Sequence, residues 1–113
     1  MFARVATFDD VDVSRADEVT AEMRKVALPL VQDLSGWSGQ LTLIDQKARR
    51  VLGITFFQTR EDIEAAEPVF EEMPQRLPTE IRDMIAGHRR SVAVYDVQVA
   101  EGIRLGEHTA VAH

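Results

Sequence analysis

The sequence predicts an α+β fold of the ferredoxin-like kind, a βαββαβ split sandwich in which two helices lie on one face of a four-stranded antiparallel sheet. Residues 2–8 and 37–58 show the two-residue alternation of strands, whereas residues 14–34 show the spacing of an amphipathic helix. A helical stretch interrupted by proline and a last strand complete the order, at residues 59–86 and 91–99. Two helices cannot cover both faces of such a sheet, so the sequence predicts that a partner buries the second face.

The first helix is predicted to begin with a capping box, because Ser14 precedes Asp17 at the required spacing. Apolar residues then recur every three or four positions and form one stripe: Ala16, Val19, Met23, Val26 and Leu30. Pro29 predicts a kink, since proline removes a backbone donor and clashes with the preceding turn. Ser35 and Gly36 predict the end of the helix.

The next two strands are predicted to form a hairpin around the polar residues 45–49. In the first of them, one face is predicted to carry Trp37, Gly39, Leu41 and Leu43. Residues 50–58 are the most β-prone segment of the chain. Both faces of that segment are apolar, with Leu52, Ile54 and Phe56 on one side and Val51, Gly53, Thr55 and Phe57 on the other. A strand of this kind is expected to be covered on both sides.

The second helical stretch is predicted to begin with another capping box, formed by Thr59 and Asp62. Pro74 and Pro78 interrupt it, and Thr79 is the expected cap of the part that resumes. The sequence predicts one domain over residues 1–100. Residues 101–113 are interpreted as a mobile tail or as a strand-like arm that reaches a partner.

Composition narrows the function classes. The 113 residues hold 13 Lys and Arg against 19 Asp and Glu, a net charge of −6, which argues against nucleic acid as a partner. No apolar run approaches the roughly 18 to 20 residues that span a bilayer, so no membrane insertion is predicted. Arg4, Asp9 and Asp10 stand where a signal peptide would be apolar, and a cytoplasmic location is expected. The absence of Cys excludes disulfides and thiolate chemistry.

Three segments of the chain resemble the antibiotic biosynthesis monooxygenase-like (ABM) family of dimeric α+β barrels. They are Leu-Ser-Gly-Trp-Ser-Gly at 34–39, Arg-Val-Leu-Gly-Ile-Thr-Phe-Phe at 50–57 and Thr-Arg-Glu-Asp-Ile-Glu-Ala-Ala at 59–66. The resemblance implies a homodimer whose sheets pack face to face, with a cavity in each protomer between sheet and helices. Members include cofactor-independent oxygenases of aromatic polyketides, quinol oxygenases and haem-degrading enzymes.

The haem-degrading branch of that family uses an Asn on the first strand, a Trp near the end of the third strand and a His on the second helix. Here Phe57 occupies the Trp position, Ala66 and Glu67 stand at the His position, and Thr7 or its neighbours replace the Asn. The sequence therefore predicts that haem does not bind tightly.

Five residues are candidates for a site. Trp37 and Phe57 are candidate walls that would stack on a flat substrate, although both rings also fit a packing role in the core or the interface, which is the favoured interpretation. Tyr95 and His88 are the candidate catalytic residues, able to orient a phenolic substrate or take its proton. Arg4 is a candidate substrate-binding residue. Packing for Tyr95 and a solvated loop for His88 are the alternatives.

No metal and no cofactor are predicted, because no second His or suitably spaced carboxylate accompanies His88. The leading hypothesis is a homodimeric ABM-type monooxygenase that oxidises a small aromatic or quinone-like molecule without a cofactor. The alternative is a non-catalytic ligand-binding or interaction module on the same barrel, which the scarcity of buried ionisable groups in the sequence favours.

Overall fold

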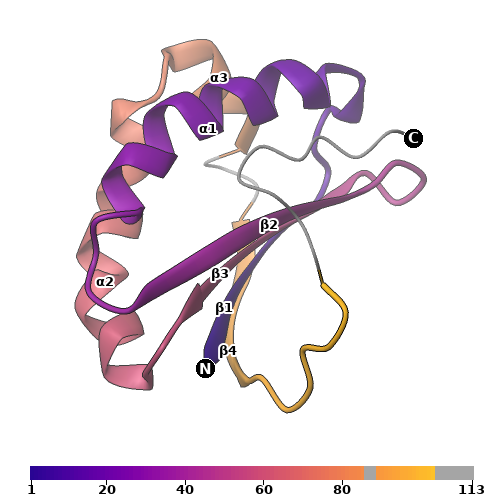
Figure 1. Ribbon diagram of the computed structural model, residues 1–113. Helices are drawn as coiled ribbons and strands as arrows, with labels where there is room; N and C mark the ends of the chain where they lie inside the picture. Colours follow the sequence, from indigo (N-terminus) through magenta and orange to yellow (C-terminus); the bar gives the residue numbers. More distant parts are fainter. Residues whose placement is uncertain (86–88, 104–113) are drawn as a thin grey trace.

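The computed structural model describes residues 1–85 and 89–103 and has the predicted α+β architecture (Figure 1). The strands are β1 (Phe2–Phe8), β2 (Trp37–Asp45), β3 (Arg50–Phe57) and β4 (Arg89–Asp96). The helices are α1 (Ala16–Val31), α2 (Arg60–Glu72) and α3 (Thr79–Ile85), with short 3₁₀ turns at Val13–Arg15 and Met73–Arg76. All of the helices lie on the same side of the sheet, which leaves its other face without a helix.

The four strands form one antiparallel sheet in the order β2-β3-β1-β4. β1 lies in the middle, where Arg4 is opposite Thr55 of β3 and Val94 of β4. Residues opposite one another in an antiparallel pair point to the same face. Arg4 and Thr55 are buried, so their face is the one covered by the helices, and Ala3 and Phe56 belong to the open face.

A β-bulge at the start of β2 changes the predicted faces of that strand. Trp37 is opposite Phe57, but Gly39 is already opposite Phe56, so Ser38 is the extra residue. The prediction that Trp37 shares a face with Gly39, Leu41 and Leu43 is therefore wrong. Trp37 points to the helices, whereas the other three residues belong to the open face, because the bulge shifts the alternation by one position.

Of the two predicted capping boxes, one forms and the other does not. The capping box of α2 is confirmed: the Thr59 hydroxyl accepts from the Asp62 N–H at 3.1 Å, and the Asp62 carboxylate accepts from the Thr59 N–H at 3.2 Å. The capping box predicted at Ser14 is wrong. The Asp12 carboxylate accepts instead from the Ser14 N–H at 3.2 Å and caps a 3₁₀ turn, and this turn leads into α1.

Three other predicted boundaries shift. Pro29 lies inside α1 as predicted, but α1 ends at Val31, before the end predicted at Ser35 and Gly36. Thr79 is the first residue of α3 rather than its cap, because the Arg82 N–H already bonds to the Pro78 carbonyl at 2.9 Å. The last strand is Arg89–Asp96 instead of residues 91–99. Its pairing with β1 ends at Phe2 and Asp96, and one more hydrogen bond follows, from the Val97 N–H to the Met1 carbonyl at 3.0 Å.

The core fills the space between the sheet and the helices. Phe57 and Ile63 are 0% and 2% exposed and pack with Ala66, joining β3 to α2. Arg15 joins α1 to α3, since its guanidinium contacts Glu18 and Glu80 at 2.6 Å each. The hydrogen bond from Arg15 lowers the pKa of the Glu18 carboxyl. No helix in the described ranges is long and apolar enough to cross a membrane.

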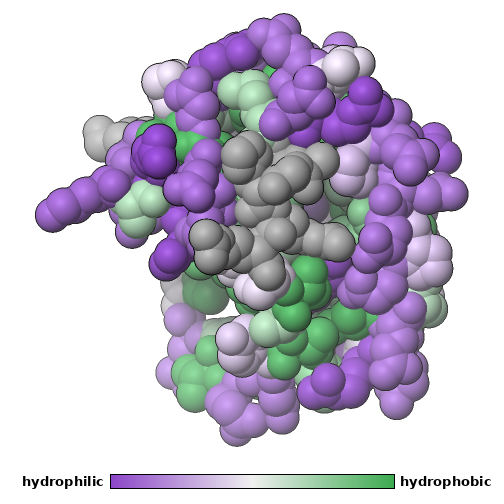
Figure 2. Space-filling model, turned by 180° about the vertical axis from the view of Figure 1, so that it is seen from behind, coloured by the Kyte–Doolittle hydropathy of each residue, from purple (hydrophilic) through white to green (hydrophobic). Residues whose placement is uncertain are grey.

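The open face of the sheet is largely apolar. Its charged pair, Asp45 and Arg50, lies at one end, and its other described members are Ala3, Val5, Thr7, Gly39, Leu41, Leu43, Leu52, Ile54, Phe56, Ser91, Ala93 and Tyr95. Leu43 and Tyr95 are 47% and 59% exposed. Seen from behind, hydrophobic side chains reach the surface within a frame of polar ones (Figure 2). The helices of the described ranges do not cover this face, because they all lie on the other side, and Ile103 lines a hollow together with its residues Gly39, Leu41 and Phe56.

Gly36 is predicted to be the least replaceable glycine of the fold. Its φ is +78°, and an added Cβ would overlap the Asp62 carboxylate of the α2 capping box. Left-handed backbone alone costs a non-glycine residue about 1–2 kcal/mol. We expect Gly36→Ala to lower the free energy of unfolding in urea by more than this amount. Gly102→Ala is the control, because Gly102 has a similar φ of +76° and nothing near its Cβ position. Equal losses in both variants would contradict the role of Asp62.

Candidate functional site

A buried guanidinium is the centre of the candidate site. Arg4 lies in the middle of β1 on the helix side and is only 3% exposed. Its Nε donates to Glu67 Oε1 at 2.7 Å and its Nη2 donates to Glu67 Oε2 at 3.3 Å. The Glu67 side chain is 36% exposed, so one end of the ion pair reaches the surface. Forked pairing of this kind holds both groups in a fixed geometry.

Aromatic rings enclose the charged part of Arg4. Its Cζ lies 3.9 Å from the centroid of the Phe70 ring, a close cation–π contact. Phe57 meets Phe70 edge-on, with centroids 6.4 Å apart and an angle of 79° between the planes. The guanidinium is therefore held between a carboxylate and a ring face, in surroundings that strengthen both interactions.

Trp37 adds a second buried donor to this region. Its ring packs on the cluster formed by Phe57, Ile63 and Ala66 and also on the cluster that includes Met73. Within the part of the chain that the structure describes, its indole Nε1 is buried and has no acceptor. A buried donor without a partner costs about 1–3 kcal/mol. Trp37 therefore offers an N–H that an acceptor could satisfy. We call Arg4, Trp37, Phe57, Glu67 and Phe70 the Arg4 cluster.

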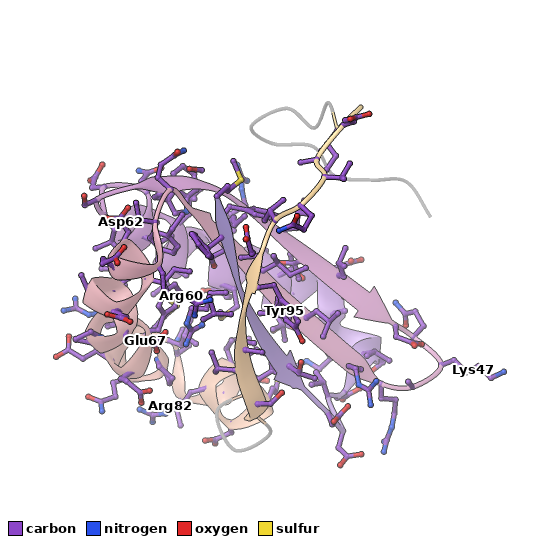
Figure 3. All side chains as sticks on the ribbon, turned by 90° about the horizontal axis from the view of Figure 1, so that it is seen from below. Lys47, Arg60, Asp62, Glu67, Arg82 and Tyr95 are labelled. Carbon is purple, nitrogen blue, oxygen red and sulfur yellow. The ribbon has the colours of Figure 1, made fainter. Side chains whose placement is uncertain are left out.

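A second guanidinium, that of Arg60, also packs on an aromatic ring. Its Cζ lies 5.2 Å from the centroid of the Phe2 ring. Figure 3 shows Arg60, Glu67 and Arg82 on the helix side of β4. Arg4 and Arg60 thus both lie over aromatic rings, and Glu67 supplies the carboxylate that pairs with Arg4.

The structure brings three of the predicted site residues together and separates the others. Arg4, Trp37 and Phe57 all lie on the helix side of the sheet. Tyr95 is opposite Ala3 and belongs to the open face, and Figure 3 shows it on the other side of β4 from Glu67. His88, the other candidate catalytic residue, lies outside the described residues.

Glu67 and Phe70 are the members of the cluster that sequence reasoning missed. Glu67 is one of six acidic residues of α2, a composition typical of a solvated helix face. Its spacing gives the missed signal: it lies four residues after the buried Ile63 and three before Phe70, on the stripe of α2 that packs against the sheet. An acid on such a stripe, facing an Arg on an apolar strand face, predicts a buried pair.

A separate cavity of about 80 Å³ lies under α1. Its lining consists of Phe8, Val11, Ala16, Val19, Thr20, Met23, Thr42, Ile44, Val51 and Gly53, so it does not touch the Arg4 cluster. A second, wider hollow of about 180 Å³ lies on the open face of the sheet and is lined by Ser38, Gly39, Gln40, Leu41, Phe56 and Ile103. Among the described residues, no group of three or more His, Asp or Glu is placed to hold a metal ion.

Among the comparisons with known proteins, only solved structures are similar to this chain, and the similarity is one of fold. No protein-family model matches the sequence, and no curated protein matches it. A provisionally assigned antibiotic biosynthesis monooxygenase of Bordetella bronchiseptica is similar in structure, with a TM-score of 0.65 and 16% identity over 87% of this chain and 97% of that one.

Two further structures extend the likeness. The haem degrader MhuD of Mycobacterium tuberculosis has a TM-score of 0.59 and 17% identity, over 90% of this chain and all (100%) of that one. A dimeric ferredoxin-like protein from an uncultured marine organism has a TM-score of 0.59 and 12% identity, with 91% of each chain covered. At these identities the likeness establishes the fold and no more. The chain therefore has the ferredoxin-like α+β fold of the antibiotic biosynthesis monooxygenase-like structures.

Proposed function

We propose that the protein is an ABM-type monooxygenase that works without a cofactor on a small aromatic molecule with an acidic hydroxyl or ring-activated C–H group. The observation that carries the proposal is the Arg4–Glu67 pair, which sets a buried cation beside a carboxylate in an aromatic environment. The structural likeness to monooxygenases supports the reaction class.

In this proposal Glu67 is the base and Arg4 stabilises the anion that results. A phenol or enol entering beside Glu67 would lose its proton to the carboxylate. The negative charge formed on the substrate would then bind the Arg4 guanidinium, which the neutralised Glu67 releases. Because Arg4 is 3% exposed, water competes little for that charge. Phe70 and Trp37, which are half-buried, supply ring surface for a flat substrate, and the fully buried Phe57 packs behind them.

The oxidation itself balances without an external reductant. A methylene group between two rings becomes a carbonyl group and gives up four electrons. Dioxygen accepts all four: one oxygen atom becomes the carbonyl oxygen, and the other leaves as water with the two methylene hydrogens. The role left to the protein is to form the electron-rich anion and to keep it away from bulk water.

A ligand-binding module on the same cluster is the second candidate. Glu67 is already held by two N–H groups of Arg4, so a ligand with its own carboxylate or phenolate could replace it without any proton transfer. Both functions need the same residues for binding. Only the oxygenase consumes dioxygen.

The residues of the cluster do not fit a haem group. The position on α2 that would present an axial ligand is held by Ala66 and Glu67, and Ala66 is 1% exposed. The Glu67 carboxylate is committed to Arg4, whose guanidinium lies 3.9 Å above Phe70. A macrocycle would have to displace this buried pair. No step of the proposed reaction therefore involves haem.

The open sheet face supports the further proposal that the protein is a homodimer. Apolar side chains from all four strands meet there, and exposed patches above a few hundred Å² are uncommon on monomers. A structure of the same fold is dimeric. Tyr95, which is 59% exposed, would then contact the partner rather than the substrate in the Arg4 cluster.

Glu67→Gln is expected to abolish oxygen uptake with an anthrone or a quinol, because the amide cannot take a proton, while most of the shape is kept. Glu64→Gln is the matched control, since Glu64 is exposed on the same helix. Thermal melts verify that each variant is folded. Uptake that survives in folded Glu67→Gln would overturn the role of Glu67. Uptake lost in Tyr95→Phe would place the reaction on the open face.

The two faces of β3 are expected to respond differently to a charge. Phe56→Lys should convert the dimer into a folded monomer, since Phe56 belongs to the open face. Thr55→Lys should unfold the chain, because Thr55 is 8% exposed beneath the helices. Sedimentation and circular dichroism check both results, with Ala65→Lys on the exposed side of α2 as the control. A wild-type species of 12.7 kDa at micromolar concentration would refute the dimer.

Haem titration is expected to give no stoichiometric shift of the Soret band, because the Arg4–Glu67 pair fills the place where haem would lie. Absorbance spectra at increasing protein concentration measure this directly. A tight one-to-one complex that is lost in His88→Ala would show that the comparison of the second helix with the haem-degrading branch is misaligned.

A further inference from the structure

The cavity under α1 exists because small residues meet there. Gly53 of β3 lies between Ala6 of β1 and Thr42 of β2, so a row of small residues crosses the helix side of the sheet. Four α1 residues line the same cavity, the small Ala16 and Thr20 together with Val19 and Met23. Gly53 leaves the widest gap: a Cβ added to it would have no neighbour closer than Phe8 Cε2, at 4.0 Å. Glycine inside a strand often marks a site where a ligand or another backbone can approach closely.

The cavity is apolar and too small for most metabolites. Apart from the hydroxyls of Thr20 and Thr42, the side chains among its described lining residues are hydrocarbon, aromatic or thioether, or absent at Gly53. A buried water needs about two to four polar partners, whereas an apolar cavity of about 150 Å³ stays dry and binds benzene or xenon. The volume here is about 80 Å³, which suits a smaller guest.

The cavity has a closed end and an open end. Val11, which is 1% exposed, seals the closed end, and its N–H donates to the Arg49 carbonyl at 3.1 Å. The ion pair between Asp9 and Arg50, at 2.6 Å, holds the same loop to the β2–β3 hairpin. Thr42 on the edge strand β2 is the exposed one of the described lining residues. A guest would therefore enter beside Thr42.

We propose that this cavity is a binding site for a small, uncharged apolar molecule of the size of dioxygen. It is distinct from the Arg4 cluster, because no residue of that cluster lines it. The assignment of dioxygen as the natural guest rests on the proposed oxygenase function. The affinity of the cavity for an apolar gas does not depend on that function. An apolar store of dioxygen beneath α1 would supply the oxidant from inside the protein while the aromatic substrate occupies the Arg4 cluster.

Xenon is the probe that tests the cavity on its own. Proton–nitrogen correlation spectra of the wild-type protein under xenon pressure should show saturable shifts in residues around the cavity, with Val11, Val19 and Gly53 among them. Gly53→Ala should weaken these shifts and Gly53→Val should remove them, because a Cβ at this position enters the cavity without a clash and the two further methyl groups of valine fill more of its volume. Ala65→Leu adds volume on the exposed side of α2 and should leave the shifts unchanged.

Thr20→Val distinguishes an apolar guest from bound water. The exchange keeps the shape and removes a hydroxyl, so xenon binding should persist or strengthen. If wild-type protein shows no saturable xenon shifts, or if Gly53→Val keeps them, the cavity is not a gas site and the inference is overturned. Loss of xenon binding in folded Thr20→Val would also overturn it, because an apolar guest does not need that hydroxyl.

Oxygen kinetics separate this inference from the proposed function. If the protein consumes dioxygen, Gly53→Val should raise the KM for dioxygen at least several-fold and leave the KM for the aromatic substrate unchanged. An unchanged KM for dioxygen would refute the supply role. Xenon binding without any oxygen uptake would refute the oxygenase and keep the apolar gas site.

Discussion

The need to satisfy a guanidinium on an apolar sheet face governs the arrangement of this molecule. Arg4 occupies the central strand on the side where the helices pack, and it is 3% exposed. A charge in that position is tolerated only with a partner, because an unpaired buried charge is strongly destabilising. Glu67 supplies the partner, and Phe70 covers the remaining face of the guanidinium. Both come from α2, so the pairing fixes how that helix lies on the sheet. It also concentrates charge and aromatic surface in one place.

The two faces of the sheet consequently have separate roles. The helix side contains the Arg4 cluster at one end of the strands and the apolar cavity at the other, where Gly53 and Thr42 replace larger side chains. The open side carries apolar residues that the helices of the described ranges do not cover. A reaction site enclosed by the helices and an interface on the opposite face do not compete for the same side chains. This division lets the proposed oxygenase and the proposed dimer coexist in so short a chain.

Sequence periodicity is sufficient to predict the order of strands and helices, since alternation and helical spacing depend on which side chains must be buried. The capping box of Thr59 and Asp62 was equally readable, because its hydrogen bonds are local. The face of Trp37 was not readable, since a single bulge at Ser38 reverses the alternation and depends on pairing with β3. The pairing of Arg4 with Glu67 was not predicted from the sequence, for a similar reason. The two residues are 63 positions apart, and their contact exists only after α2 has packed on β1.

The most direct test of this account is to observe the side chains of the Arg4 cluster while a flat phenolic ligand is added. The Nε–H of Arg4 and the Nε1–H of Trp37 give distinct signals in proton–nitrogen correlation spectra. The account predicts that both signals shift saturably, with Arg4 assigned through the loss of its signal in Arg4→Lys. Shifts confined to residues of the open face around Tyr95, with the Arg4 and Trp37 signals unchanged, would contradict it.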